Sequence, residues 1–510
     1  MTGTGSAANS AGALWDEAAP SAAALIESLR GVGYTPAAAI ADLLDNSITA
    51  GAGRAWLNMQ WAGASSRVAL LDDGEGMEEA ELVAAMRPGS RSPRDSRQPG
   101  DLGRFGLGLK TASFSQARRL TVATKKTGCV SIRRWDLDHV VAVDEWQLLH
   151  GTHPQTEPAL LESLVTLDHG TLVIWENLDR LLGQGIEHDV GAADRFYALC
   201  ENVERHLAMV FHRFLELPRP TLALYMNGRT ERSRVKGWDP FLRNHGATWS
   251  SPVEIIRSTE GPAEIQGYVL PHQDRLSPVE FGEAGGPEGW LAQEGFYVYR
   301  NMRLLSSGGW MDLGSPRAWT REEPYKLARI RVDITNAQDS SWRVDIKKSA
   351  VHPPDGIRSR LRDLAERVRE QARRVFVYRG SPARRTTVDA PVERLWVGGG
   401  NANVYRIDRN NPLVAAARDN ADLVEALLVA IERSVPVQRI WLDITDNGPP
   451  AQRDGIPSDE VRRAAHVLYR NFRLRAQLSE DDARRKLLRL EPFDLYPEFI
   501  NGLADDLMDA

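Results

Sequence analysis

The sequence has 510 residues, of which 42% are hydrophobic and 26% are charged, with a formal net charge of −6. This length predicts about three domains, and the charge excludes a protein drawn to nucleic acid or anionic membranes by overall positive charge. The two cysteines, Cys129 and Cys200, lie too far apart in the chain to suggest a disulfide framework or a zinc site. We therefore expect a protein of a reducing compartment, the cytoplasm.

The pattern along the chain predicts three structured parts, preceded by a short disordered start and with one linker before the last part. Residues 1–13 lack the basic stretch and apolar core of a secretory signal, and we expect them to be disordered. Residues 14–216 alternate helical and strand patterns, and residues 217–379 combine strand-like runs with a long helix. A polar linker at 380–394 leads to a mainly helical part at 395–510. We find no apolar run long enough to span a bilayer and expect no membrane contact.

The first part begins with two predicted helices, at 21–30 and from Pro36 onward. Thr35 is a good N-cap and proline suits the first helical position. Two strands, 54–61 and 67–73, are predicted to form a hairpin across AGASS. A further helix is expected at 78–86, and further strands at 118–126, 129–137 and 170–178. The pattern predicts a sheet covered by helices, and not a helical bundle.

The second helix carries the stretch ADLLDNS with polar residues on one face. Helical spacing places Asp42, Asp45, Asn46 and Thr49 together, opposite an apolar face that includes Ser47. One interpretation is a solvated polar surface. The other is a functional site, because Asp42 and Asn46 lie one turn apart and can point to the same place. An amide oxygen suits Mg²⁺ beside phosphates, and a carboxylate can accept a proton from attacking water.

Two glycine-containing motifs come next. The strand LLDDGEGM ends at Asp72, which is either part of a tight acidic turn or a carboxylate that recognises a base. The stretch DLGRFGLGLKTAS is not a Walker A loop, because Leu109 separates Gly108 from Lys110. Its glycines still allow backbone N–H groups to approach a polyphosphate, although a flexible basic loop fits equally well. The preceding loop at 87–101 has the length of a lid or a disordered segment.

In chain order, ADLLDNS, DDGEGM, GRFGLGLKTAS and GTLVIWENL resemble the four boxes of the GHKL ATPase superfamily. Its members include DNA gyrase B, MutL, the ninety-kilodalton heat-shock chaperones and histidine kinases. The stretch LGRFGLGLKTASFSQ is most similar to the MORC branch and its bacterial relatives. The resemblance implies an α+β protein whose GHKL (Bergerat) α/β sandwich binds ATP with Mg²⁺ and hydrolyses the nucleotide.

The resemblance also implies a role for each matching position. Asp42 corresponds to the catalytic carboxylate, Asn46 to the magnesium ligand, Asp72 to the aspartate that recognises the adenine amino group, and Thr171 to the threonine that supports this aspartate through a water. The other nucleotide-binding positions are Gly74, Gly76 and Met77 at the base, and Gly103, Phe105, Gly106, Gly108 and Lys110 at the phosphates.

One position departs from the family pattern. The family usually has glutamate where this chain has Asp42, whose side chain is shorter by one methylene. Misplacement of a catalytic group by about 1 Å can lower a rate roughly a hundredfold. Either the backbone is shifted to compensate, or hydrolysis is slow.

The second part resembles the α/β transducer domain of MORC and MutL-like proteins, which extends a lysine to the γ-phosphate. EGFYVYRNMRLL is similar to its strand-turn-strand. The place of the family's lysine is held by Ala337, and the nearest alternatives are Lys347 and Lys348, of which we favour Lys348 as the catalytic residue. A surface lysine pair fits the pattern equally well. The basic amphipathic helices of the last part fit a docking module or a surface for nucleic acid.

The expected function is an ATPase that closes into a homodimer when ATP binds. By resemblance, such a protein acts on duplex DNA with partner proteins, for example in bacterial restriction-modification or antiviral defence. The alternative is a chaperone-like or scaffold ATPase that acts on protein partners. We disfavour a histidine kinase, because we find no dimerisation helix with a phosphoacceptor histidine before the ATPase motifs, and a topoisomerase, because we find no domain with a catalytic tyrosine.

Overall fold

The protein is described by a computed structural model, in which the chain forms two compact units, Met1–Thr387 and Val388–Ala510. The described residues are 20–31, 33–89, 102, 108–183, 189, 191–216, 220–258, 261–344, 351–377, 396–398, 405–409, 414, 421–437, 440, 457–488, 490, 493 and 496–504. The expected disordered start, 1–13, and the expected linker, 380–394, lie outside them.

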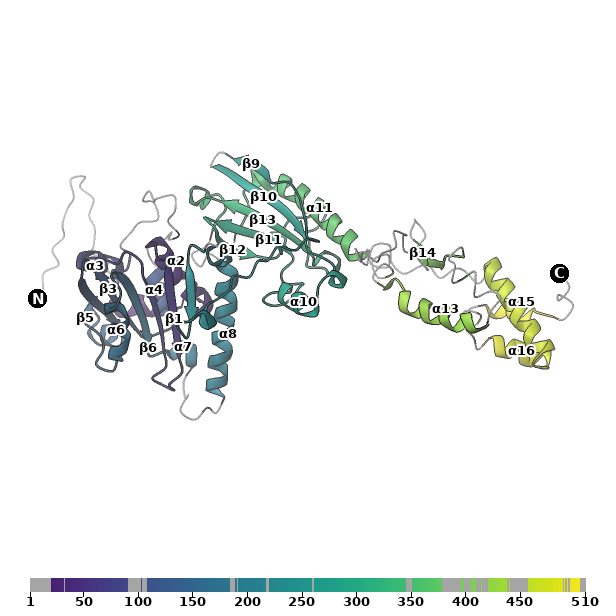
Figure 1. Ribbon diagram of the computed structural model, residues 1–510, viewed down its shortest axis with the longest axis horizontal. Coiled ribbons are helices and arrows are strands. Elements are labelled where there is room, and N and C mark those ends of the chain that lie inside the picture. The colour runs from purple at the N-terminus through teal and green to yellow at the C-terminus, as the bar shows by residue number, and fades with distance from the viewer. Residues whose placement is uncertain are drawn as a thin grey trace, which may run out of the picture. The chain divides into compact units, whose positions relative to one another are not determined.

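The first unit begins with a seven-stranded sheet in the order β5-β4-β3-β6-β2-β1-β7 (Figure 1). Neighbouring strands are antiparallel except for the parallel pair of β1 and β7. The predicted hairpin of β1 and β2 is confirmed by their pairing. The strands are β1 (Arg54–Gln60), β2 (Arg67–Asp72), β3 (Arg119–Lys126), β4 (Cys129–Asp136), β5 (Leu149–His150), β6 (Gly170–Glu176) and β7 (Ala223–Met226). The sheet therefore extends past residue 216, where we expected the first part to end.

Helices cover both faces of this sheet. They are α1 (Ala22–Arg30), α2 (Pro36–Thr49), α3 (Glu79–Met86), α4 (Gly108–Phe114), α5 (Leu137–Val143), α6 (Pro158–Val165), α7 (Asp179–Leu182), α8 (Ala192–Val210) and α9 (His212–Leu215). The main core joins one face of the sheet to α1, α2, α4 and α8. A smaller core joins the other face to α6 through Leu164. This arrangement, helices on a sheet, confirms the predicted α+β class.

Helix α2 passes through the middle of the main core. Its N-cap is Thr35, whose hydroxyl accepts a hydrogen bond from the Ala38 N–H, and Pro36 occupies the first turn, both as predicted. Ile40 and Leu44 are completely buried. Helix α2 also contacts α4 and α8, and Asp42 and Asp45 on its polar face are buried.

A second sheet follows in the same unit, in the order β12-β11-β13-β10-β8 with β9 paired to β10. Its strands are β8 (Trp249–Ser250), β9 (Glu254–Ser258), β10 (Gly261–Val269), β11 (Gly295–Arg300), β12 (Arg303–Ser307) and β13 (Ala328–Ile334). Its helices are α10 (Pro278–Ala284) and α11 (Asp355–Val377), and short 3-10 turns lie at Glu231–Ser233, Gln273–Arg275, Glu323–Tyr325 and Asn336–Gln338. The predicted strand-turn-strand is therefore formed by β11 and β12.

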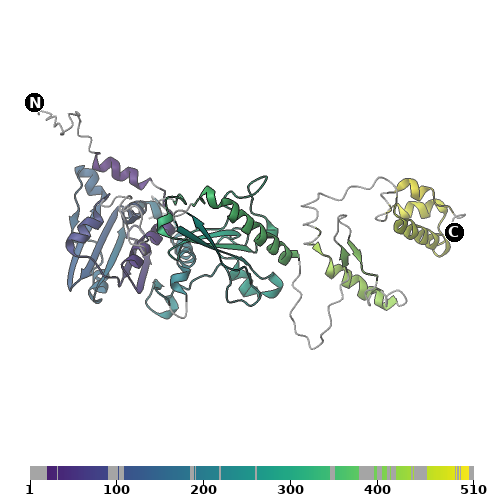
Figure 2. The ribbon, with the colours of Figure 1, turned by 90° about the horizontal axis from the view of Figure 1, so that it is seen from above.

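The two faces of the second sheet contact different parts of the unit. Helix α11 lies along one face, as both views show (Figures 1 and 2). Its Leu361 and Val368 are buried in the core of this sheet. On the other face, Tyr297 and Tyr299 pack with Met209 from the end of α8. The second sheet is therefore docked against the helix that also covers the first sheet.

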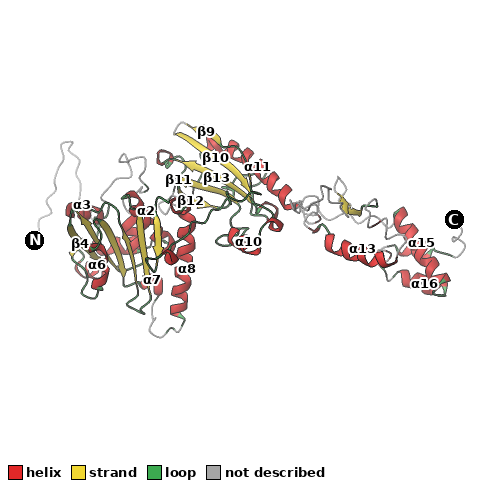
Figure 3. Cartoon of the chain, viewed as in Figure 1, coloured by secondary structure: helices red, strands yellow, loops and turns green. Residues whose placement is uncertain are grey.

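The second unit is smaller and mainly helical within its described residues (Figure 3). Its helices are α13 (Ala421–Ser434), α15 (Asp459–Leu474), α16 (Glu480–Leu487) and α17 (Pro497–Asn501). An antiparallel pair, β14 (Trp396–Gly398) and β15 (Tyr405–Ile407), was not predicted. A small core includes Tyr469, Leu487 and Ile500. Across the described parts of both units, no helix combines the length and apolar character needed to cross a membrane.

Candidate functional site

Asp42 lies in the enclosed part of α2. Its side chain is 4% exposed, so the alternative of a solvated polar face is wrong for this residue. The Tyr34 hydroxyl donates to Asp42 Oδ2 at 2.8 Å. A Cβ built on Gly108 would lie 3.5 Å from the same oxygen. The carboxylate is thus fixed by a tyrosine on one side and lies against the first residue of α4, directly after the glycine-rich loop.

Asn46 lies one turn further along α2 and, in contrast, is exposed. An exposed amide oxygen beside a buried carboxylate fits Mg²⁺, which keeps several waters and takes few ligands from a protein when phosphates supply the others. The helix therefore presents a candidate proton acceptor and a candidate metal ligand on neighbouring turns.

Asp72 ends β2 and is 5% exposed. The Ser47 hydroxyl donates to Asp72 Oδ2 at 2.7 Å, and the Gly74 N–H donates to Oδ1 at 3.0 Å. Burial raises the pKa of Asp72, while the hydrogen bonds from Ser47, Gly74 and the Thr171 backbone act in the opposite direction. These hydrogen bonds fix the orientation of both carboxylate oxygens, as recognition of one edge of a base requires.

The β2–β6 register places Thr171 directly opposite Asp72. The Thr171 hydroxyl lies 3.3 Å from that of Thr124 on β3, and Thr124 Oγ1 accepts a hydrogen bond from the Met77 N–H at 2.9 Å. Asp72, Thr171 and the turn that contains Met77 are thus connected at one edge of three adjacent strands.

Gly76 permits this turn to pass close to β3. Its φ is +68°, and a Cβ at this position would lie 2.1 Å from the Lys125 carbonyl oxygen. We expect Gly76→Ala to lower the free energy of unfolding by about 2 kcal/mol or more, measured by urea denaturation. The control is Gly128→Ala, because Gly128 also has a positive φ of +81°, but a Cβ added there would meet nothing within 4 Å. Equal losses in both variants would show that the close approach does not matter.

The phosphate positions are placed only in part. Gly103, Phe105 and Gly106 lie outside the described residues, as do Lys347 and Lys348. Gly108 begins α4 beside Asp42. Lys110 is 3% exposed, and its ammonium donates to the Ala85 carbonyl of α3 at 2.9 Å. In the structure the Lys110 ammonium therefore contacts α3, and its contact with phosphate stays a prediction.

Three residues of the site were assigned no role from the sequence. Tyr34 holds Asp42, and Ser47 holds Asp72 although we had assigned it to the apolar face of α2. A single hydroxyl within an apolar stripe was the available signal for Ser47, since buried hydroxyls need a partner. Asp45 is 1% exposed and pairs with Arg303 of the second sheet. No local pattern could have indicated this pair.

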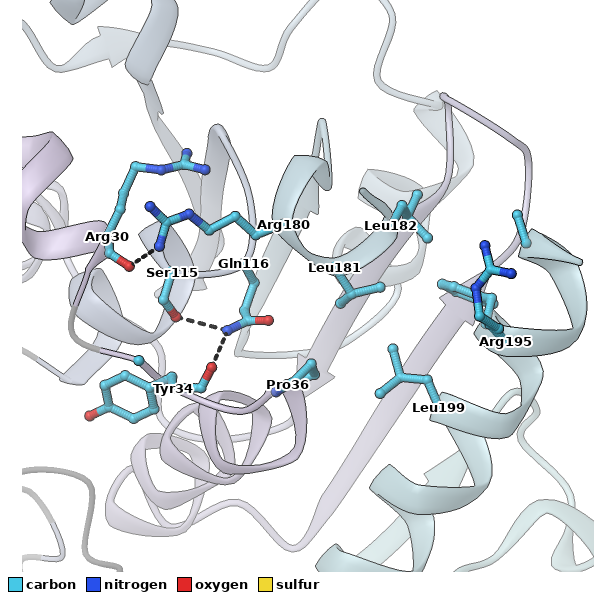
Figure 4. Close-up of a pocket in the computed structure, with 13 residues that line it drawn as sticks. Arg30, Tyr34, Pro36, Ser115, Gln116, Arg180, Leu181, Leu182, Arg195 and Leu199 are labelled. Atoms are coloured by element: carbon cyan, nitrogen blue, oxygen red, sulfur yellow. Dashed lines mark hydrogen bonds between the residues drawn. The ribbon is translucent and has the colours of Figure 1, made fainter. Parts of the chain in front are cut away.

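A cavity of about 330 Å³ shares Tyr34 with the site (Figure 4). Arg30, Gln116, Arg180 and Leu199 also line it, and the Gln116 amide donates to the Tyr34 carbonyl at 3.1 Å. Among the described residues, the candidate nucleotide-binding positions 46, 72 and 171 do not line this cavity. It is therefore a neighbour of the candidate site and not the site itself.

Apart from this site, His212, Glu216 and Asp239 form a group of potential metal ligands. Arg243 is bound to both carboxylates, and His212 Nε2 lies 2.8 Å from the Tyr299 hydroxyl. Burial lowers the pKa of His212. Because an arginine already neutralises the acids, we assign this group to the contact between α9 and the second sheet.

Together, these features fit the class of nucleotide-binding α/β domains: two buried, oriented carboxylates, an exposed asparagine and a glycine turn converge at one side of a sheet. Residues 34–171 match the family model described as histidine kinase-, DNA gyrase B-, and HSP90-like ATPase. This stretch of the chain is therefore similar to GHKL-type ATPase domains. The match ends before the second sheet and does not distinguish the MORC branch from others. No curated protein matches the chain.

Proposed function

We propose that the protein binds ATP together with Mg²⁺ and hydrolyses the nucleotide slowly, as a member of the GHKL superfamily closest to the MORC branch and its bacterial relatives. The observation that carries the proposal is the pair on α2: Asp42, buried and held by Tyr34, one turn from the exposed Asn46, with Gly108 alongside. A helix with this pair inside a GHKL-type domain has the groups that phosphoryl transfer to water requires.

Adenine recognition is assigned to Asp72. Its carboxylate accepts a hydrogen bond from the exocyclic amino group, and Ser47 and the Gly74 N–H keep the oxygens in place. Gly76 and Met77 form the turn beside the base, and Thr171 supports Asp72 from the neighbouring strand. A site built to hydrogen-bond an amino group discriminates strongly against nucleotides that lack it.

Hydrolysis is assigned to Asp42. Its carboxylate accepts a proton from the attacking water, while Tyr34 fixes the carboxylate plane. Asn46 would hold Mg²⁺, which neutralises charge on the phosphates when bound. Residues 103–108 and Lys110 would contact the phosphates, and Lys348 would reach the γ-phosphate, as the resemblance implies. The shorter side chain of aspartate supports the expectation of a slow rate.

We further propose that ATP closes a homodimer and that the second sheet acts as a transducer. The MORC-like and MutL-like resemblance of β11 and β12 supports this assignment. In the same proposal the protein acts on duplex DNA, together with partner proteins of a defence or restriction system in the cytoplasm. The helices of the second unit would then be docking or DNA-contacting elements. The net charge of −6 is also compatible with the alternative, a chaperone-like or scaffold ATPase with protein partners.

The test is phosphate release from ATP with Mg²⁺, with and without duplex DNA, together with the mass in solution with and without a non-hydrolysable ATP analogue. We expect slow turnover that requires Mg²⁺ and a doubled mass with the analogue. Stimulation by DNA that weakens steeply with salt would favour the DNA-directed form of the proposal. A rate of turnover that is the same with and without DNA would favour protein partners. The absence of both turnover and ATP binding would overturn the proposal.

A further inference from the structure

The turn between β11 and β12 carries two buried arginines. Arg300 ends β11 and is fully buried, and Arg303 begins β12 and is 3% exposed. The residues between them, Asn301 and Met302, both have positive φ angles, 48° and 71°. This tight turn belongs to the second sheet, yet both arginine side chains contact residues of the GHKL-type domain.

Arg303 reaches the acidic face of α2. Its Nε lies 3.1 Å from each carboxylate oxygen of Asp45, and its Nη2 lies 3.9 Å from Asp42 Oδ1. Its Nη1 donates to the Leu304 carbonyl at 2.8 Å, which fixes the guanidinium plane. The Asp42 carboxylate is therefore approached from two sides, by the Tyr34 hydroxyl at Oδ2 and by Arg303 at Oδ1.

The contact places the positive charge of Arg303 beside two buried carboxylates. Asp42 and Asp45 are two buried carboxylates on one helix, and buried charges need a partner to remain ionised. His206 of α8 does not supply a second cation, because burial and the charge of Arg303 lower its pKa to about 4. Arg303, which belongs to the second sheet, thus supplies positive charge to both carboxylates of α2.

Arg300 extends the same contact toward the phosphate loop. Its Nη1 donates to Asp339 Oδ2 at 2.6 Å, and its Nη2 donates to the carbonyl of Leu102, the residue before the first glycine of the loop. One turn of the second sheet is therefore bonded both to the helix of the candidate proton acceptor and to the chain that enters the glycine-rich loop.

We propose that Arg303 is a positioning residue for ATP hydrolysis: through its ion pair with Asp45 and its approach to Asp42, it holds the Asp42 carboxylate where it accepts the proton from water. This inference rests on the proposed function. It makes turnover depend on docking of the second sheet against α2, by a contact that is independent of any lysine near the γ-phosphate. It also gives the shorter aspartate a fixed position.

The test compares Arg303→Met and Arg303→Lys with Arg213→Met in the full chain. Arg213 of α9, a helix that contacts β7 of the first sheet, also binds the second sheet through Asp333 and the ring of Tyr299, so it controls for lost contact between the sheets. We expect R303M to lower kcat by about a hundredfold, the effect of a misplaced catalytic group, with KM and the affinity for a non-hydrolysable analogue unchanged. R303K should recover part of the rate, and R213M should retain it.

Each outcome is decisive when thermal unfolding is measured alongside. Unchanged kcat in R303M, or equal losses in R303M and R213M, overturns the inference, as does a parallel loss of kcat and nucleotide affinity. If R303M does not fold, Asp45→Asn replaces it: a lower kcat at unchanged affinity supports the inference, and an unchanged kcat overturns it. An inactive wild-type protein that still binds ATP identifies a failure of the proposed hydrolysis itself, and the inference falls with it.

Discussion

Replacing Asp42 by asparagine is expected to lower kcat for ATP hydrolysis by about a hundredfold or more, while ATP still binds. Asparagine has nearly the same shape, and its amide oxygen can still accept the hydrogen bond from Tyr34. It cannot, however, accept a proton from water. Arg303 keeps its pair with Asp45, so the fold is expected to tolerate the change. Phosphate release and binding of a non-hydrolysable analogue measure the two effects separately.

Asp168→Asn is a suitable control for this variant, because Asp168 is exposed and lies just before β6. Its substitution removes the same charge from the same domain and should leave kcat unchanged. If D42N turned over ATP as fast as the wild type, Asp42 would not be the proton acceptor. If D42N lost ATP binding as well, Asp42 would contribute to binding the nucleotide and not specifically to its hydrolysis.

Replacing Asp72 by asparagine should produce opposite effects on stability and binding. Burial raises the pKa of Asp72 in the folded protein above its ordinary value. The folded state therefore binds a proton at the Asp72 carboxyl more tightly than the unfolded state does. The free energy of unfolding consequently falls as the pH rises through the pKa that Asp72 has in the folded protein. Asparagine removes that loss, so D72N should unfold at a higher temperature than the wild type at pH 7. Its affinity for ATP should fall at least about tenfold, because a charged hydrogen-bond acceptor is lost.

The measurements are thermal unfolding at pH 7 and pH 4 and calorimetric titration with ATP. The stability advantage of D72N should shrink at the lower pH. Asp73→Asn is the matched control, since the neighbouring Asp73 pairs with the exposed Arg54 instead. It should retain ATP affinity. A destabilised D72N would mean that the hydrogen bonds from Ser47 and Gly74 outweigh the effect of burial, and retained ATP affinity would remove Asp72 from the base pocket.

Local signals in the sequence were sufficient for much of the first domain. Thr35 and Pro36 marked the start of α2, and two strand-like runs separated by AGASS predicted the hairpin of β1 and β2. These features depend on contacts between residues close in the chain, which the order of residues expresses directly. The spacing of Asp42 and Asn46 on one helix is a feature of the same kind.

Features that depend on distant contacts could not be predicted in this way. Asp45 and Arg303 are separated by 258 positions, and nothing near either residue indicates that the two meet. Ser47 was assigned to the apolar face because its partner, Asp72, belongs to another element. The pair of β14 and β15 was missed because each strand is too short to show a period.

The parallel pairing of β7 with β1 determines where the chain can be divided. A fragment that stopped at residue 216 would lack β7 and would leave one side of β1 with unpaired N–H and C=O groups. Exposed strand edges of this kind recruit other chains and promote aggregation. Val235 also packs in the main core. A soluble piece that carries the nucleotide site therefore has to extend through β7 and Val235.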